Sequence, residues 1–229
     1  MPVLAEELTR FKAHRWQVSC LEFNHDGSQL ASGGWDKEVH IWDLGSLEVV
    51  HTMKGNRVPI TCLSWYRQNS GILCTGSADQ TASLWNTETG SCIATLKEHF
   101  GWVLGSCFST SGSLLATSSW DKTVRIWDAG TATLINNLSG HTAGVWSVDF
   151  HPKSSTLCSA GQDGSVIVWD ARSNKPVCKL SSGHTDAVYS AKWSPDGAMI
   201  ASGSADTKVR KILINSSLCL YTFYMAISY

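Results

Sequence analysis

The sequence predicts an all-β fold of about five repeated four-stranded units, each one blade of a propeller. An aspartate recurs with steps of 43, 42, 42 and 43 residues, at Asp36, Asp79, Asp121, Asp163 and Asp206. Within each copy, alternating segments such as "VWSVDF" (145–150) are separated by turn segments such as "SPDG" (194–197), and nothing has a helical period. A repeat of about 42 residues that contains four short strands is typical of a propeller blade.

Other residue types recur in the same register as the aspartate. A hydroxyl side chain lies four residues before it, at Ser32, Thr75, Thr117, Ser159 and Ser202. Six residues after the first four aspartates comes a tryptophan, at Trp42, Trp85, Trp127 and Trp169. A histidine precedes four of the five aspartates by 22 residues, at His14, His99, His141 and His184. These coincident periods predict one supersecondary unit repeated along the chain.

The units follow one another along most of the chain. Residues 1–12 are expected to form an outer strand without a blade of its own, because "LTRFKAH" (8–14) resembles "IATLKEH" (93–99), where one unit runs into the next. The predicted repeats span 13–54, 55–97, 98–139 and 140–182, followed by an incomplete fifth repeat at 183–212 and a divergent apolar tail at 213–229.

The tail departs from the repeat because Ile212 stands where the other copies have tryptophan. An altered end that replaces further blades is the favoured interpretation of residues 213–229. A membrane anchor is the alternative, although these residues are interrupted by polar side chains and only just reach spanning length.

Composition and charge exclude several classes of function. The chain has 18 basic and 19 acidic side chains and a net charge of −1, so it lacks the electrostatic signature of a nucleic-acid-binding protein. The segment "MPVLAEELTRFKAHRW" contains no signal peptide, which predicts an intracellular protein, cytoplasmic or nuclear. The eight cysteines form no Cys-x-x-Cys pair and are expected to be free thiols, so no metal or other cofactor is predicted.

The segments "SGHTAGVWSVDF" (139–150) and "LCSAGQDGSVIVWD" (157–170) resemble the WD-repeat family, and the resemblance covers about residues 14–210. It implies a hydrogen-bonded tetrad of His, Ser or Thr, Asp and Trp inside each blade. The implied tetrads are His14, Ser32, Asp36 and Trp42; His99, Thr117, Asp121 and Trp127; and His141, Ser159, Asp163 and Trp169. Blade two departs from the pattern with Asn56 in place of histidine. The resemblance also implies that an outer strand such as residues 1–12 closes the ring. Seven blades are usual in the family, so the sequence leaves open whether the ring closes with five blades or is incomplete.

The tetrads could be mistaken for catalytic triads, since each contains a hydroxyl, a histidine and a carboxylate. An enzyme needs one such set in a cleft, whereas here the set recurs at a fixed period. We therefore expect the tetrads to be structural and the protein to be non-enzymatic. The predicted function is a protein-interaction scaffold, and a truncated product with little function of its own is an alternative.

Tryptophan is in excess, with 11 in the chain. Six occupy framework positions of the repeat, and five remain, all next to a tetrad histidine or turn aspartate: Trp16, Trp35, Trp102, Trp120 and Trp146. The family resemblance implies that these segments border the channel end of the ring, where partners bind. With Tyr189 they form the predicted partner-binding face, suited to an extended peptide because tryptophan is enriched in binding hot spots. The alternative is that these side chains pack between neighbouring blades.

A second motif concerns the opposite end of a blade. "VWDAR" (168–172) places Asp170 and Arg172 in the spacing of a Trp-Asp-x-Arg box, which resembles WD proteins that dock onto an adaptor of cullin-RING ubiquitin ligases. The resemblance implies a substrate-receptor role as an alternative function. An exposed turn arginine with no partner is the other interpretation.

Overall fold

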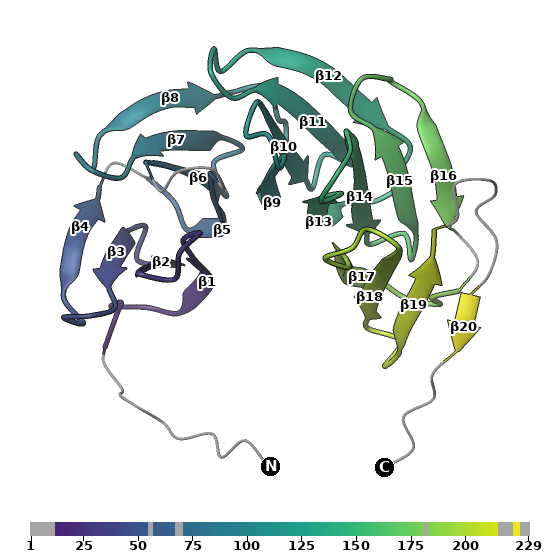
Figure 1. Cartoon of the computed structure of the whole chain (residues 1–229), viewed down its shortest axis with the longest axis horizontal. Coiled ribbons are helices and arrows are strands. Elements are labelled where there is room, and N and C mark those ends of the chain that lie inside the picture. The colour runs from purple at the N-terminus through teal and green to yellow at the C-terminus, as the bar shows by residue number, and fades with distance from the viewer. Residues whose placement is uncertain (1–11, 55–56, 67–70, 181–182, 215–221, 225–229) are drawn as a thin grey trace.

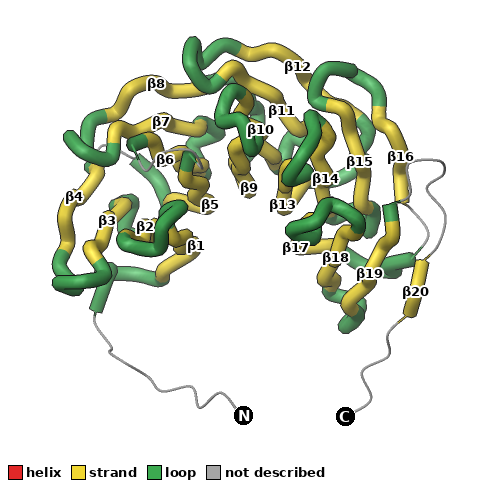
Figure 2. The backbone as a smooth tube through the Cα atoms, viewed as in Figure 1, coloured by secondary structure: helices red, strands yellow, loops and turns green. Residues whose placement is uncertain are grey.

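The five blades form an open arc in the computed structural model, which describes residues 12–54, 57–66, 71–180, 183–214 and 222–224. All of its regular structure is β-strand, and the described residues therefore contain no helix able to cross a membrane (Figure 2). The predicted all-β propeller architecture is confirmed. Figure 1 shows that the first and fifth blades do not meet, so the ring is not closed.

Each blade is one antiparallel sheet of four strands in chain order. Blade one comprises β1 (Val18–Phe23), β2 (Gln29–Gly34), β3 (Val39–Asp43) and β4 (Val49–Met53). Blade two comprises β5 (Ile60–Trp65), β6 (Ile72–Ser77), β7 (Ala82–Asn86) and β8 (Cys92–Leu96). Blade three comprises β9 (Val103–Phe108), β10 (Leu114–Ser119), β11 (Thr123–Asp128) and β12 (Leu134–Ser139). Blade four comprises β13 (Val145–Phe150), β14 (Thr156–Gly161), β15 (Val166–Asp170) and β16 (Pro176–Leu180). Blade five comprises β17 (Val188–Trp193), β18 (Met199–Ser204), β19 (Val209–Leu213) and β20 (Thr222–Tyr224).

The first strand of each blade lines the inside of the arc and the fourth lies outside (Figure 1). In blades two to four the second and third strands are buried on both faces, because a neighbouring sheet packs on each side, as β6 and β7 of blade two show. The fourth strands are largely exposed, and buried and exposed residues do not alternate regularly along them, as "CIATL" of β8 shows. Burial therefore decreases from the middle of each sheet to its outer strand.

The core is divided among the four junctions between blades. One apolar cluster occupies each junction, and the cluster between blades one and two contains Met53 and Ile60 with Trp65. A hydrogen bond also crosses this junction, because the Trp65 backbone N–H donates to the Glu22 carboxylate at 3.1 Å. The junction between blades four and five repeats this arrangement with Trp193 N–H and Asp149 at 2.9 Å.

Every first strand contains an irregularity at the same place. The pairing with the second strand shifts by one residue, which leaves one residue of the first strand without a partner opposite it. This is a β-bulge, which bends a strand and redirects one side chain. The bulge residues are Ser19, Thr61, Leu104, Trp146 and Tyr189.

The predicted closing strand and the predicted apolar tail lie at the two ends of the chain. Residues 1–11 of the predicted closing strand lie outside the described residues. The outer position of the fifth sheet is taken by β20, from within the predicted tail, where Lys211 pairs with Phe223. Ile212 is buried at the position where the other blades have tryptophan.

The exposed first blade offers a matched test of the junction cores. Phe108 and Phe23 share one repeat position, but Phe108 is 2% exposed at the junction of blades two and three, whereas Phe23 is 58% exposed. We expect Phe108→Ala to lower the free energy of unfolding by about 3–5 kcal/mol, since it removes a buried aromatic ring. Phe23→Ala should cost less than about 1 kcal/mol. Urea unfolding followed by tryptophan fluorescence measures both, and equal losses would contradict the junction assignment.

Candidate functional site

A buried set of hydrogen bonds organises the channel end of most blades, and blade three shows this set in full. His99 Nδ1–H donates to Asp121 Oδ2 at 2.7 Å, and His99 Nε2 accepts from the Thr117 hydroxyl at 2.8 Å. The same hydroxyl accepts from Trp127 Nε1–H at 2.9 Å. The four side chains thus form one chain of hydrogen bonds from the turn to the centre of the sheet.

Blades one and four contain the same four-membered set. His14 Nδ1 lies 2.9 Å from Asp36, and His141 Nδ1 lies 3.0 Å from Asp163. Each imidazole Nε2 lies 2.8 Å from the serine of its blade. The tryptophan of each blade completes the set, donating from Nε1 to that serine at 2.9 Å in blade one and 2.8 Å in blade four.

Blades two and five contain incomplete sets. In blade five, His184 bonds to Asp206 at 2.8 Å and to Ser202 at 2.9 Å, but Ile212 offers no indole donor. In blade two, Trp85 donates to Thr75 at 2.9 Å, while Asn56 lies outside the described residues.

The hydrogen bonds hold the turn carboxylates in the charged form. Burial alone would raise the pKa of Asp121, but donors from His99, Thr123 and the Phe100 backbone outweigh it and hold that pKa well below its usual range. The pKa is lowered in the same way at Asp36, Asp163 and Asp206. Each carboxylate therefore contributes stability that is present above about pH 4 and is lost as the pH falls through its lowered pKa.

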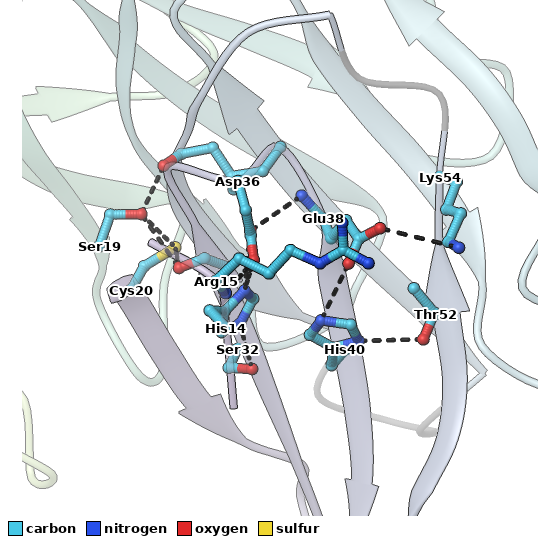
Figure 3. Close-up of polar contacts among 12 residues, drawn as sticks. His14, Arg15, Ser19, Cys20, Ser32, Asp36, Glu38, His40, Thr52 and Lys54 are labelled. Carbon is cyan, nitrogen blue, oxygen red and sulfur yellow. Dashed lines mark hydrogen bonds and ion pairs between the residues drawn. The ribbon is translucent and has the colours of Figure 1, made fainter. Parts of the chain in front are cut away.

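Blade one has a second histidine beside its tetrad (Figure 3). His40 Nδ1 lies 3.0 Å from Thr52 Oγ1, and His40 Nε2 lies 3.4 Å from the Glu38 carboxylate. The His14 and His40 ring centroids are 4.6 Å apart. Burial, followed by the nearby His14, lowers the pKa of His40, which favours the neutral imidazole.

These residues are also a possible set of metal ligands. Ligand atoms of His14, Asp36 and His40 lie within 4.8 Å of one another. Both nitrogens of His14 and the Asp36 carboxylate are already bonded within the tetrad, however, and Lys54 lies 3.7 Å from Glu38. A metal ion would have to break the tetrad, so the chemistry of this cluster favours a structural role.

The turn that follows each tetrad aspartate has one fixed backbone shape. The residue after the aspartate has a positive φ of 69–75° in all five blades: Lys37, Gln80, Lys122, Gly164 and Thr207. A left-handed residue closes the three-residue hairpin loop that begins with a type I turn. Only blade four uses glycine, which adopts this φ without strain, and in the other four blades the residue at this position is exposed.

The residue before the aspartate is fixed by a backbone hydrogen bond. Trp120 N–H donates to Trp102 O at 2.9 Å, and Trp35 N–H donates to Gln17 O at 2.8 Å. Each bond ties the turn to the loop that precedes the first strand of the same blade. The same backbone hydrogen bond therefore positions the turn tryptophans of blades one and three.

Aromatic side chains from three blades line one groove of about 730 Å³ on the inner side of the arc. Its walls are Trp35, Phe100, Trp102, Trp120 and Trp146. Its other lining residues are the bulge residues Ser19, Thr61 and Leu104, together with Gln80 and Gly101. We call this site the aromatic groove. None of its lining residues carries a formal charge.

Two of the groove tryptophans also pack across a blade junction. The Trp120 and Trp146 rings meet edge to face at 5.4 Å, and Trp146 meets Tyr189 in the same way at 5.3 Å. Trp146 Nε1–H donates to Gln162 Oε1 at 2.8 Å, which fixes the orientation of the ring. A Cβ on Gly144 would lie 2.8 Å from Trp120 Cε3, so glycine allows this ring to lie against blade four.

The predicted face divides into three groups. Trp35, Trp102, Trp120 and Trp146 line the groove, and each of the first three is about half exposed. Tyr189 reaches the group through its contact with Trp146. Trp16 is 73% exposed but is absent from the groove lining.

Sequence reasoning missed three of the bulge residues, Ser19, Thr61 and Leu104, and it also missed Gln80 and Phe100. Their signal was the repeat register, because the bulge residues precede the turn aspartate by 17 or 18 residues in every copy. Phe100 follows a tetrad histidine directly, and its ring lies 5.7 Å from the Arg125 guanidinium.

Asp170 and Arg172 lie at the other end of β15 from the Asp163 turn. Asp170 Oδ1 accepts from the Arg172 backbone N–H at 3.0 Å and from the Ser155 hydroxyl at 3.1 Å. The Arg172 side chain is exposed. The pair thus forms an ordered turn that presents one cationic side chain to solvent.

Comparison with known proteins adds a family match. The family model described as "WD domain, G-beta repeat" matches residues 5–43, 47–86, 90–128, 132–170 and 174–211. Over 94 residues, 39% of the chain, it is 36% identical to "Anaphase-promoting complex subunit cdc20" of Dictyostelium discoideum, covering 19% of that protein. Over 91 residues, 36% of the chain, it is 33% identical to "Cell division cycle 20.1, cofactor of APC complex" of Arabidopsis thaliana, covering 20% of that protein.

One Arabidopsis thaliana relative matches almost the whole chain. "Transcriptional corepressor LEUNIG_HOMOLOG" is 29% identical over 221 residues, which is 96% of this chain and 27% of that protein. The chain therefore spans about a fifth to a quarter of the length of these relatives.

Blades two and three offer a matched test of the tetrad. Asp121→Ala should destabilise the protein by about 1–3 kcal/mol, because it leaves the buried His99 without its carboxylate. Asp79 holds the same repeat position, but within the described residues its exposed carboxylate accepts only from Thr81. Asp79→Ala should change stability by about 0.5 kcal/mol or less. Thermal melts of both variants make the comparison, and an unchanged melt for Asp121→Ala would refute the structural role.

Proposed function

This chain belongs to the WD40 repeat family, and on that premise we propose that it is a non-enzymatic scaffold that binds an extended segment of another protein in the aromatic groove. The observation that carries the proposal is the convergence of half-exposed tryptophans from blades one and three on one uncharged groove. Tryptophan offers a large rigid contact area at low entropic cost and is enriched in binding hot spots.

The burial of the tetrads supports a non-enzymatic role. Thr117 and Ser159 are fully buried, and each hydroxyl is bonded to both an imidazole and an indole. A nucleophile must reach its substrate from a cleft, which these hydroxyls cannot do.

The setting we propose is intracellular. The relatives include a subunit and a cofactor of the anaphase-promoting complex and a transcriptional corepressor, by their names. Such names suit a chain that serves as one interaction module of a larger assembly.

Trp35 is the better probe of recognition, because Trp120 also packs against Gly144 and Trp146. Within the described residues, Trp35 has no aromatic ring contact of this kind. Substitution of Trp120 is therefore expected to change both stability and partner binding, whereas substitution of Trp35 should change partner binding alone.

We predict that Trp35→Ala weakens partner binding by at least about 2 kcal/mol while the melting temperature stays near that of the wild type. Trp120→Ala should weaken binding and also lower stability, since its ring packs across a junction. Affinity purification with mass spectrometry identifies the partners, and titration of a recovered partner gives the affinity. Val177→Ala, at an exposed site on the outer strand β16, is the matched control. Partners retained in full by Trp35→Ala would place the binding face elsewhere.

A second candidate function is substrate reception for a cullin-RING ubiquitin ligase through Asp170 and Arg172. The observation that favours it is the ordered turn, in which Asp170 is held by Ser155 while Arg172 projects into solvent. An arginine presented in this way can make charge-assisted hydrogen bonds to a carboxylate of a docking partner.

We predict that Arg172→Ala weakens co-precipitation of the ligase adaptor by about tenfold or more and leaves binding at the aromatic groove unchanged. Lys175→Ala, an exposed cation on the same β15–β16 connection, is the control for a general loss of charge. Equal recovery of the adaptor with Arg172→Ala, or its absence from the wild-type sample, would remove this function.

A further inference from the structure

We propose that the aromatic groove and the two lysines beside it select a peptide segment in which a bulky apolar side chain is flanked by acidic residues. The inference rests on the proposed function, which assigns peptide binding to the groove but does not state the chemistry of the peptide. It follows from the repeated turn sequence Trp-Asp-Lys, at 35–37 and 120–122.

The groove itself fits an apolar side chain. Its walls are aromatic faces, and none of its lining residues is charged. The hydroxyl protons of Ser19 and Thr61 are already donated to the backbone carbonyls of Ile60 and Val103, across blade junctions. Burial of an aliphatic or aromatic ligand side chain is therefore favourable, at about 25 cal/mol per Å² of apolar surface.

The turns beside the groove present positive charge. Lys37 and Lys122 are exposed at the left-handed position that follows Asp36 and Asp121. Those two carboxylates are engaged by His14 and His99. Each turn thus presents an indole and an ammonium group to solvent, while its carboxylate is bonded inside the blade.

Three lysines of the protein are engaged by an acidic side chain. Lys192 bonds to Asp149 at 2.9 Å, Lys179 lies 3.5 Å from Asp163, and Lys54 lies 3.7 Å from Glu38. Within the described residues, neither Lys37 nor Lys122 forms an ion pair. Their charges are therefore available to a ligand.

Tryptophan and lysine occur together on this turn in blades one and three only. Blade two has Ala78 and Gln80 at these positions, and blade four has Gln162 and Gly164. The carboxylate of Asp79 in blade two is exposed. The acidic residues of the ligand should therefore lie over blades one and three and avoid blade two.

The test is a display library of short linear peptides with randomised positions, selected on the whole chain. The wild type should enrich peptides with Leu, Phe or Trp next to Asp or Glu. Their affinity should fall when salt is raised from about 0.01 M to about 0.15 M, which shortens the Debye length from about 30 Å to about 8 Å. Lys37→Ser and Lys122→Ser should each weaken the selected peptides about two- to fivefold. Trp35→Ala should weaken them about 30-fold.

The controls separate this inference from the proposed function. Lys175→Ser removes an exposed lysine on the β15–β16 connection, and it should leave the affinity unchanged. Thermal melts exclude unfolding of any variant. Apolar peptides that depend on Trp35 but show no acidic enrichment and no effect of the lysine variants would overturn the inference alone. If no selected peptide depends on Trp35, both the inference and the proposed function fail.

Discussion

The structure depends on the burial of a charged carboxylate at one hairpin turn in four of the five blades, and this burial is stable only because several donors meet it. In blade three the Asp121 carboxylate accepts from the His99 imidazole, the Thr123 hydroxyl and the Phe100 backbone. An unpaired carboxylate at that depth would take up a proton or move to solvent. Because the donors come from the preceding loop and from the start of the third strand, satisfying the charge fixes both of these segments relative to the turn that carries the aspartate.

That constraint also determines what the channel end of the arc presents to solvent. With the aspartate turned inward, the residues on either side of it must turn outward, and the left-handed φ of Lys37 and Lys122 is part of this geometry. The preceding tryptophan is held by a backbone bond to its neighbouring loop. The surface properties of the turn are thus a consequence of its buried charge, and damage to the tetrad should displace the groove as well as weaken the blade.

The repeat register was sufficient to predict the all-β propeller, because each blade must supply the same residue types at the same spacing. It also singled out Trp35 and Trp120 as residues without a framework position. It could not anticipate the packing of Trp120 on Gly144, which is a contact between blades and has no period. The bulge residues Ser19, Thr61 and Leu104 were missed because an unpaired residue interrupts the two-residue alternation from which strands are predicted. The β20 strand was missed because Ile212 removes the tryptophan that marks the end of the other third strands.

The bulge residues have a consequence for how such a surface changes over evolutionary time. A residue with no partner across the strand carries little of the pairing energy, so its side chain can be exchanged while the sheet persists. The five blades already hold five different residue types there, Ser19, Thr61, Leu104, Trp146 and Tyr189, within one architecture. Duplicated copies of such a gene could therefore come to bind different ligands through single substitutions at the bulge position. None of these steps would require a variant that fails to fold.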